Sequence, residues 1–299
     1  MKLRSASHSG SWYSNNPKEL KKQLTGLLKE ATDCVTNNTP IRALVSPHAG
    51  YRHCSKTASY AWKQVAISDQ TISRIIILGP SHKYSTKKCL ITPFTHLETP
   101  FGNLEVDLET NNRLLESDHF VKCKKKIDLK EHSLEMMYPW IAHVVGLQRA
   151  KIVPIMVGRL DLETQKECGQ VLKQYFQDPN TLFVISSDFC HWGIRFGFIK
   201  TYESKKKNNK RLPIWKSIQK IDALAIDTIK TLDFEKYWEY QNKWRTTICG
   251  RRAIGILLSA SSQEKQQLQF EFLHYSQSKK VLDPKETSVS YAAGVLFEK

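Results

Sequence analysis

Several features are absent from this 299-residue sequence. It has no apolar run near the roughly 20 residues that a membrane helix needs. Its charged first residues, Met1–His8, lack the apolar stretch of a secretory signal peptide. Its seven cysteines form no CxxC pair, which argues against a zinc ribbon or a thioredoxin-like site. There is no internal repeat, and the only linker-like stretch, residues 204–211, is short. We therefore expect one intracellular domain over residues 1–299 with no membrane span.

Positive charge is abundant, because the 45 lysines and arginines outnumber the 29 aspartates and glutamates and give a formal net charge of +16. Two lysine-rich runs, residues 122–126 and 205–211, concentrate part of it. Neither run interleaves aromatic residues that could stack on bases, and no nucleic-acid-binding motif accompanies them. We interpret both as solvated loops. Nucleic-acid binding through them is the less favoured alternative.

Secondary-structure patterns alternate along the chain. Apolar runs predict strands at residues 41–46, 74–78, 151–157, 182–186, 267–274 and 287–297. Helical spacing predicts helices at residues 17–32, 55–66, 107–117, 131–147, 161–177, 213–231, 233–243 and 250–262. Pro154, inside the third strand, indicates an edge strand or a bulge. Continuously apolar strands are typical of a sheet covered on both faces. The sequence therefore predicts an α/β fold with a central mixed, mostly parallel sheet flanked by helices on both faces.

Histidines follow three of the predicted strands. His48 follows the strand at 41–46, His82 follows the strand at 74–78, and His191 follows the strand at 182–186, three residues after Asp188. Ligands of open α/β sheets bind beyond the carboxyl ends of the strands, so these side chains could converge. Histidine is also the commonest protein metal ligand and a suitable proton carrier near neutral pH.

A metal site with two histidines needs a third ligand, as in the two-histidine, one-carboxylate sites of non-haem iron enzymes. Asp188 is one candidate. Cys249 is another, because it opens a predicted helix beside Gly250 and two arginines. We expect that position to lower the pKa of its thiol. The alternative for Cys249 is a buried cysteine at a helix start, and the residues alone leave the choice open.

Motifs along the whole chain resemble those of the Memo family (mediator of ErbB-driven cell motility). They occur in family order and comprise Ala6–Tyr13 (ASHSGSWY), Ser46–Tyr51 (SPHAGY), Ile76–His82 (IILGPSH), Glu131–Met136 (EHSLEM), Ser186–Gly193 (SSDFCHWG), Thr247–Arg251 (TICGR), Tyr275–Ser278 (YSQS) and Ser288–Gly294 (SVSYAAG). The resemblance implies a single Memo-like domain, similar in fold to class III extradiol non-haem iron dioxygenases. It also implies a copper or iron site built from His48, His82 and Cys249. A thiolate ligand would make the site softer, which favours copper(I) or zinc.

The surrounding residues have chemistry that suits roles at such a centre. His191 would transfer protons, with its ring oriented or tuned by Asp188, and Trp12, Tyr51 and Arg195 would line a ligand-binding surface. His132 would be a partner of the ligands, or else a capping or packing residue.

These roles imply a redox-capable metal-binding protein of the cytoplasm, and also of the nucleus, that acts in cell motility, morphogenesis or cytoskeletal signalling. One alternative is a non-catalytic module that binds phosphotyrosine-containing or other signalling proteins over a vestigial site. Another is an active non-haem iron dioxygenase or related metal-dependent oxidoreductase.

Overall fold

The computed structural model describes residues 1–202 and 212–299. Its main sheet is built around four parallel strands, which lie in the order β2 (Ile41–Ser46), β9 (Thr181–Ser186), β3 (Arg74–Pro80) and β8 (Lys151–Val157). Further strands, most of them in antiparallel pairing, extend both sides of this centre. The additional strands are β12 (Ser288–Glu298), β11 (Leu268–Gln277), β10 (His191–Trp192), β4 (Cys89–Ile91) and β7 (Phe120–Lys122). The sheet is therefore mixed with a parallel centre, as expected.

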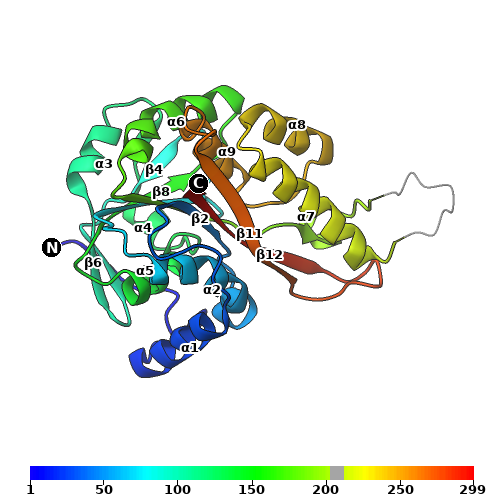
Figure 1. Ribbon diagram of the computed structural model, residues 1–299, viewed down its shortest axis with the longest axis horizontal. Coiled ribbons are helices and arrows are strands. Elements are labelled where there is room, and N and C mark those ends of the chain that lie inside the picture. The colour runs from blue at the N-terminus through cyan, green and yellow to red at the C-terminus, as the bar shows by residue number, and fades with distance from the viewer. Residues whose placement is uncertain (203–211) are drawn as a thin grey trace.

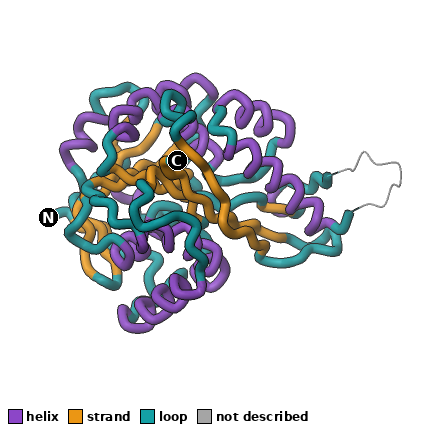
Figure 2. Tube along the Cα trace, viewed as in Figure 1, coloured by secondary structure: helices purple, strands orange, loops and turns teal. Residues whose placement is uncertain are grey.

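Helices cover both faces of this sheet (Figures 1 and 2). One face packs against α1 (Pro17–Glu30), α2 (Tyr51–Ile67) and α5 (Tyr138–Val144), and the other against α6 (Leu162–Gln177), α7 (Ile214–Lys230), α8 (Phe234–Trp244) and α9 (Arg251–Ala260). Along β3, Ile75 and Ile77 enter the first core, whereas Ile76 and Leu78 enter the second. Because successive side chains of a strand point to opposite faces, a strand buried on both sides is apolar throughout.

A second, smaller sheet ties the N-terminus to the body of the molecule. It consists of β1 (Leu3–Arg4), β5 (His96–Thr99) and β6 (Gly102–Glu105). The sequence patterns did not predict it, because strands of two to four residues are too short to establish a period. The short elements α3 (Leu108–Leu114), α4 (Lys125–Asp128), η1 (Glu135–Met137) and η2 (Ile194–Phe196) complete the described structure.

Two sequence expectations are wrong in detail. Helical structure expected from residue 131 begins only at Glu135, because the Glu131 side chain accepts the backbone N–H groups of His132 and Ser133 and holds an irregular loop. Pro154 lies in an interior strand. On one side Pro154 pairs with β3. On the other side the residues after it pair with β4, and Ile152 before it forms an isolated bridge with Val106, so Pro154 itself has no partner in either contact. A ladder hydrogen bond is not required of it there.

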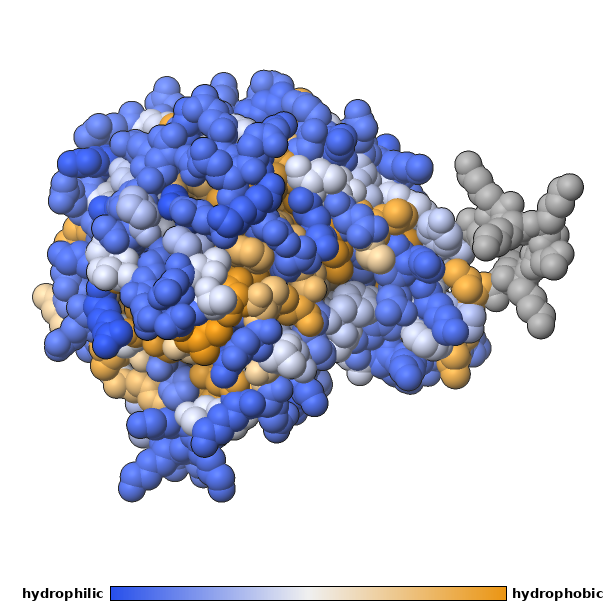
Figure 3. Space-filling model, in the orientation of Figure 1, coloured by the Kyte–Doolittle hydropathy of each residue, from blue (hydrophilic) through white to orange (hydrophobic). Residues whose placement is uncertain are grey.

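Hydrophilic residues dominate the face of the molecule seen in Figure 3. The four lysines of the 122–126 run are exposed, as expected, whereas the run at 205–211 lies outside the described residues. Among the helices that the structure describes, none has the length and apolar character needed to span a bilayer.

Candidate metal centre

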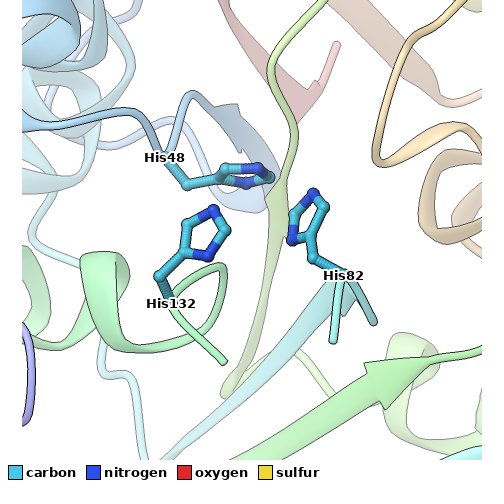
Figure 4. Close-up of side chains that lie close together, drawn as sticks. All are labelled: His48, His82 and His132. Carbon is cyan, nitrogen blue, oxygen red and sulfur yellow. The ribbon is translucent and has the colours of Figure 1, made fainter. Parts of the chain in front are cut away.

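Three histidines meet at the carboxyl edge of the parallel strands. His48 follows β2, His82 follows β3, and His132 comes from the loop that precedes η1. Figure 4 shows their rings directed toward one another. One nitrogen from each ring lies within 4.8 Å of the others. The rings of His82 and His132 are stacked with centroids 4.6 Å apart, and His48 lies edge-on to both.

Hydrogen bonds orient two of these rings. The Ser186 hydroxyl donates to the Ser133 carbonyl, so it accepts from Nδ1–H of His48, 2.6 Å away. His82 donates both its backbone N–H and its Nδ1–H to the Glu131 carboxylate, at 2.6 and 2.8 Å. In both rings Nε2 keeps its lone pair. A neutral imidazole held by its other nitrogen is the form that binds a metal ion.

The electrostatics of the cluster also suit a metal ion. Burial, followed by the positive charge of neighbouring histidines, holds the pKa of His48 well below its ordinary value and lowers that of His132 to about 3. Burial alone would raise the pKa of Glu131, but hydrogen bonding to His82 and the charges of His82 and His132 hold it below its usual range. At neutral pH the rings of His48 and His132 are therefore uncharged beside a carboxylate, so the donor set fits a cation.

Cys249 lies beside the cluster, with its sulfur 3.2 Å from Nε2 of His48 and accepting the Asp188 N–H at 3.1 Å. The expected lowering of its thiol pKa is wrong. Burial, followed by the Asp188 carboxylate, raises that pKa, and these effects outweigh the helix start and the two arginines. A metal ion would have to displace the thiol proton before the sulfur could coordinate it. The role of Cys249 as a ligand remains a prediction.

Asp188 and His191 lie close to the cluster but are not hydrogen-bonded to each other through their side chains. Asp188 accepts the backbone N–H of His48 at 2.8 Å. Its burial raises its pKa, an effect that the charge of His191 opposes. Nδ1–H of His191 donates to the Phe189 carbonyl at 2.9 Å, which leaves Nε2 available. The ring of His191 is therefore oriented by a backbone carbonyl, and Asp188 acts on it through charge alone.

Two cavities adjoin the cluster, and His191 and Phe196 line both. The first, about 570 Å³, contains His82 and Cys249. The second, about 460 Å³, is lined by Trp12, His132, Asp188 and Arg195 among others. Trp12 packs on His132 with ring centroids 4.5 Å apart, so the aromatic side chain predicted at the surface lies directly over the histidines.

Tyr51, which was expected at the same surface, lies elsewhere. Its side chain is buried, it packs between Tyr13 and Trp140, and its hydroxyl donates to the Met136 carbonyl at 2.8 Å. It lines neither cavity. The structure therefore gives the ring of Tyr51 a packing role.

Sequence reasoning did not place His132 among the metal-facing residues and did not single out Glu131. Both belong to the Glu131–Met136 string, so a signal was present. The apparent helical periodicity of residues 131–147 concealed the loop that turns His132 toward His48 and His82.

Comparison with known proteins shows the family of this chain. A family model described as "Memo-like protein" matches residues 4–295. The chain is 43% identical to "Protein memo-1 homolog" of Caenorhabditis elegans over 98% of this chain and 82% of that protein. It is 37% identical to "Protein MEMO1" of Homo sapiens over 98% and 97%, respectively.

A crystal structure of an uncharacterized protein from Escherichia coli K12 is similar with a TM-score of 0.52 and 12% identity. The match covers 84% of this chain and 98% of that one. This likeness concerns the fold, which is consistent with the dioxygenase-like architecture expected from the resemblance. The family model and the curated relatives show that the chain belongs to the Memo-like protein family.

Proposed function

We propose that the protein binds a redox-active metal ion, copper or iron, at the histidine cluster. We further propose that it serves cell motility, morphogenesis or cytoskeletal signalling in the cytoplasm and nucleus, as its family resemblance implies. The observation that carries the metal proposal is the convergence of His48, His82 and His132, whose ring nitrogens lie within 4.8 Å of one another. One buried, one half-buried and one exposed imidazole that converge in this way form a poor hydrophobic core but a good ligand set.

The surrounding side chains suit this task. Ser186 and Glu131 engage Nδ1 of His48 and His82, respectively, which leaves Nε2 of both rings available to a ligand. Cys249 offers a sulfur at the edge of the cluster, and its coordination would favour copper(I) or zinc over iron. A bound copper or iron ion would supply one-electron transfer from an external reductant to dioxygen, which yields superoxide. His191, with Nε2 free at the junction of both cavities, could give or take a proton there.

Metal binding by purified variants tests the proposal. The full-length protein, stripped with a chelator, is titrated with Cu(I), Fe(II) and Zn(II). We expect His48→Ala and His132→Ala to weaken binding at least tenfold, because each removes one of three ligands. His119→Ala is the matched control, since this partly buried histidine pairs with Glu167 outside the cluster. Unchanged affinity for all three ions in both variants would refute the proposed site.

The same titration decides the role of Cys249. If its sulfur is a ligand, Cys249→Ser should weaken Cu(I) binding more than Fe(II) binding, because a hydroxyl is a harder donor than a thiolate. Equal affinities in Cys249→Ser and the parent protein would confine the ligand set to histidines. Oxygen uptake with catechols, measured on the loaded protein, would separate an active dioxygenase from a protein that only cycles electrons.

Recognition of phosphotyrosine-containing or other signalling proteins is a second candidate function. It is favoured by Trp12 and Arg195, which line the same cavity of about 460 Å³. A large aromatic ring beside a guanidinium is a common arrangement at protein interfaces. Arg195→Ala should weaken binding of a phosphotyrosyl peptide and leave the metal content unchanged. If binding is unaffected, the peptide does not use this cavity.

A further inference from the structure

Three strongly exposed apolar side chains gather at one end of the molecule. Apart from Met1, the most exposed large apolar residues of the described part of the chain are Ile194, Leu282 and Ile199, at 72%, 70% and 60%. We call these three residues the apolar patch. Figure 3 shows apolar residues among hydrophilic ones at the end where α7 and the turn between β11 and β12 lie. A single exposed aliphatic side chain is ordinary on a protein surface, but a group of them indicates an interaction site.

The fold holds the three side chains near one another. Phe198 and Val281 are buried in the same small core. Ile199 directly follows the first of them and Leu282 directly follows the second, so both flank that core on its outer side. Ile194 lies in the turn that Phe198 closes by pairing with the start of the same segment. The patch therefore has a fixed base and keeps its aliphatic side chains in solvent.

Basic side chains surround the apolar patch. This end of the molecule is formed by three segments, residues 193–202, 212–216 and 278–287. Together they contain six lysines and arginines and two acidic residues. Both acidic side chains are engaged locally, because Glu286 pairs with Lys279 and Asp283 accepts the backbone N–H of Lys285. The surface around the patch is therefore positive and complements an anionic partner.

Trp215, at the start of α7, adds an amphipathic ring beside the patch. Its backbone N–H donates to the Val281 carbonyl at 3.1 Å, which ties it to the turn that carries Leu282. Nζ of Lys216 and Nζ of Lys280 lie 5.3 and 5.1 Å from the centroid of its indole ring. Tryptophan, lysine and exposed aliphatic residues together are typical of protein surfaces that enter the headgroup region of a bilayer.

We propose that this end of the molecule binds the surface of an anionic lipid bilayer. Ile194, Ile199 and Leu282 would enter the headgroup region, and the lysines around them would contact the negatively charged headgroups. A bilayer offers charge to the lysines and an apolar layer to the patch, whereas a nucleic-acid backbone offers charge alone. The inference goes beyond the proposed function and does not depend on a metal ion.

Co-sedimentation of the full-length protein with phosphatidylcholine vesicles, with and without phosphatidylserine, tests this proposal. We expect binding to vesicles that contain phosphatidylserine and at least tenfold weaker binding to phosphatidylcholine alone. The triple variant Ile194→Ser, Ile199→Ser, Leu282→Ser should weaken binding at least tenfold, and the fold should tolerate it because all three side chains are exposed. Leu108→Ser, Val121→Ser removes exposed apolar residues elsewhere and is the matched control, which should bind normally.

A second pair of variants tests the positive charge. Lys280→Gln, Lys285→Gln should weaken binding to phosphatidylserine vesicles about tenfold, because both side chains are exposed beside the patch. Lys125→Gln, Lys126→Gln removes the same charge from the basic run that follows β7, at the opposite end of the main sheet. This control should bind like the parent protein.

Three outcomes would overturn the proposal. They are no binding of the parent protein to phosphatidylserine vesicles, equal binding of the parent and the triple variant, and equal weakening by the two lysine variants. If the parent binds polyglutamate and not vesicles, and the triple variant loses that binding, the patch serves an acidic protein partner and the membrane assignment is wrong. The triple variant should keep its metal affinity, so the metal proposal and this one can fail separately.

Discussion

Asp222 lies on α7 with no exposed surface. The folded protein keeps a proton on this side chain at pH values where the unfolded chain has lost it, so the free energy of unfolding should fall as the pH rises. Its carboxyl group accepts the Cys190 N–H at 3.2 Å and contacts the Tyr275 hydroxyl at 2.8 Å. Burial raises its pKa to about 7, although hydrogen bonds from Ser290, Tyr275 and Cys190 oppose the rise. The unfolded chain has an ordinary aspartate with a pKa of 3.8.

The sign follows from proton binding. Between about pH 4 and pH 7 the folded protein keeps a proton on Asp222 that the unfolded chain has released. Stability must therefore fall as the pH rises through that window and level off above it. Each pH unit corresponds to about 1.4 kcal/mol, so the fall amounts to about 4 kcal/mol over the whole window and about 3 kcal/mol between pH 5 and pH 8.

Asp222→Asn should abolish this contribution, because the amide has nearly the same shape and cannot ionise. Urea unfolding of both proteins at pH 5 and pH 8 measures the difference, in which the titration of all other groups cancels. We expect the variant to gain about 3 kcal/mol relative to the parent protein between the two pH values. Asp227→Asn, on the exposed side of the same helix, is the control and should show no such gain. A difference in unfolding free energy that is the same at both pH values would refute the reasoning.

Two further predictions concern charged groups that hold the N-terminal segment and the metal-facing loop. Arg4 is 2% exposed and pairs with Asp128 at 2.6 Å and Glu135 at 2.5 Å. Arg4→Met should therefore cost about 3–5 kcal/mol in urea unfolding by leaving buried carboxylates unpaired, and a cost below about 1 kcal/mol would contradict this. Glu131→Gln should weaken metal binding about 10- to 100-fold with little change in unfolding, because it loosens the ring of His82. Metal titration checks the second prediction, which fails if affinity is unchanged.

Much of the fold could be predicted from local patterns. The runs at 41–46 and 74–78 became β2 and β3, and the helix predicted at 161–177 became α6 at Leu162–Gln177. The two strands are buried on both faces and the helix is long with one buried face, so their own residues show the period of each element. The small sheet of β1, β5 and β6 could not be predicted, because β1 depends on a partner about 90 residues away and β5 and β6 have only four residues each. A two-residue strand carries no pattern of its own.

The candidate site shows the same division between local and distant information. His48 and His82 could be placed because each directly follows a buried parallel strand, and parallel strands end at one edge of the sheet. His132 follows no strand. Its position depends on Glu131, which caps the loop and binds His82 at the same time, and that contact joins residues 49 positions apart.

The thiol of Cys249 shows why the protonation state of a site residue is harder to predict than its position. A helix start and adjacent arginines favour a thiolate, and both features can be read from neighbouring residues. The opposing effects are burial and the carboxylate of Asp188, 61 residues earlier in the chain, and these prevail in the folded protein. Neighbouring residues therefore place Cys249 at a helix start, whereas the packing of distant residues determines whether its thiol carries a charge.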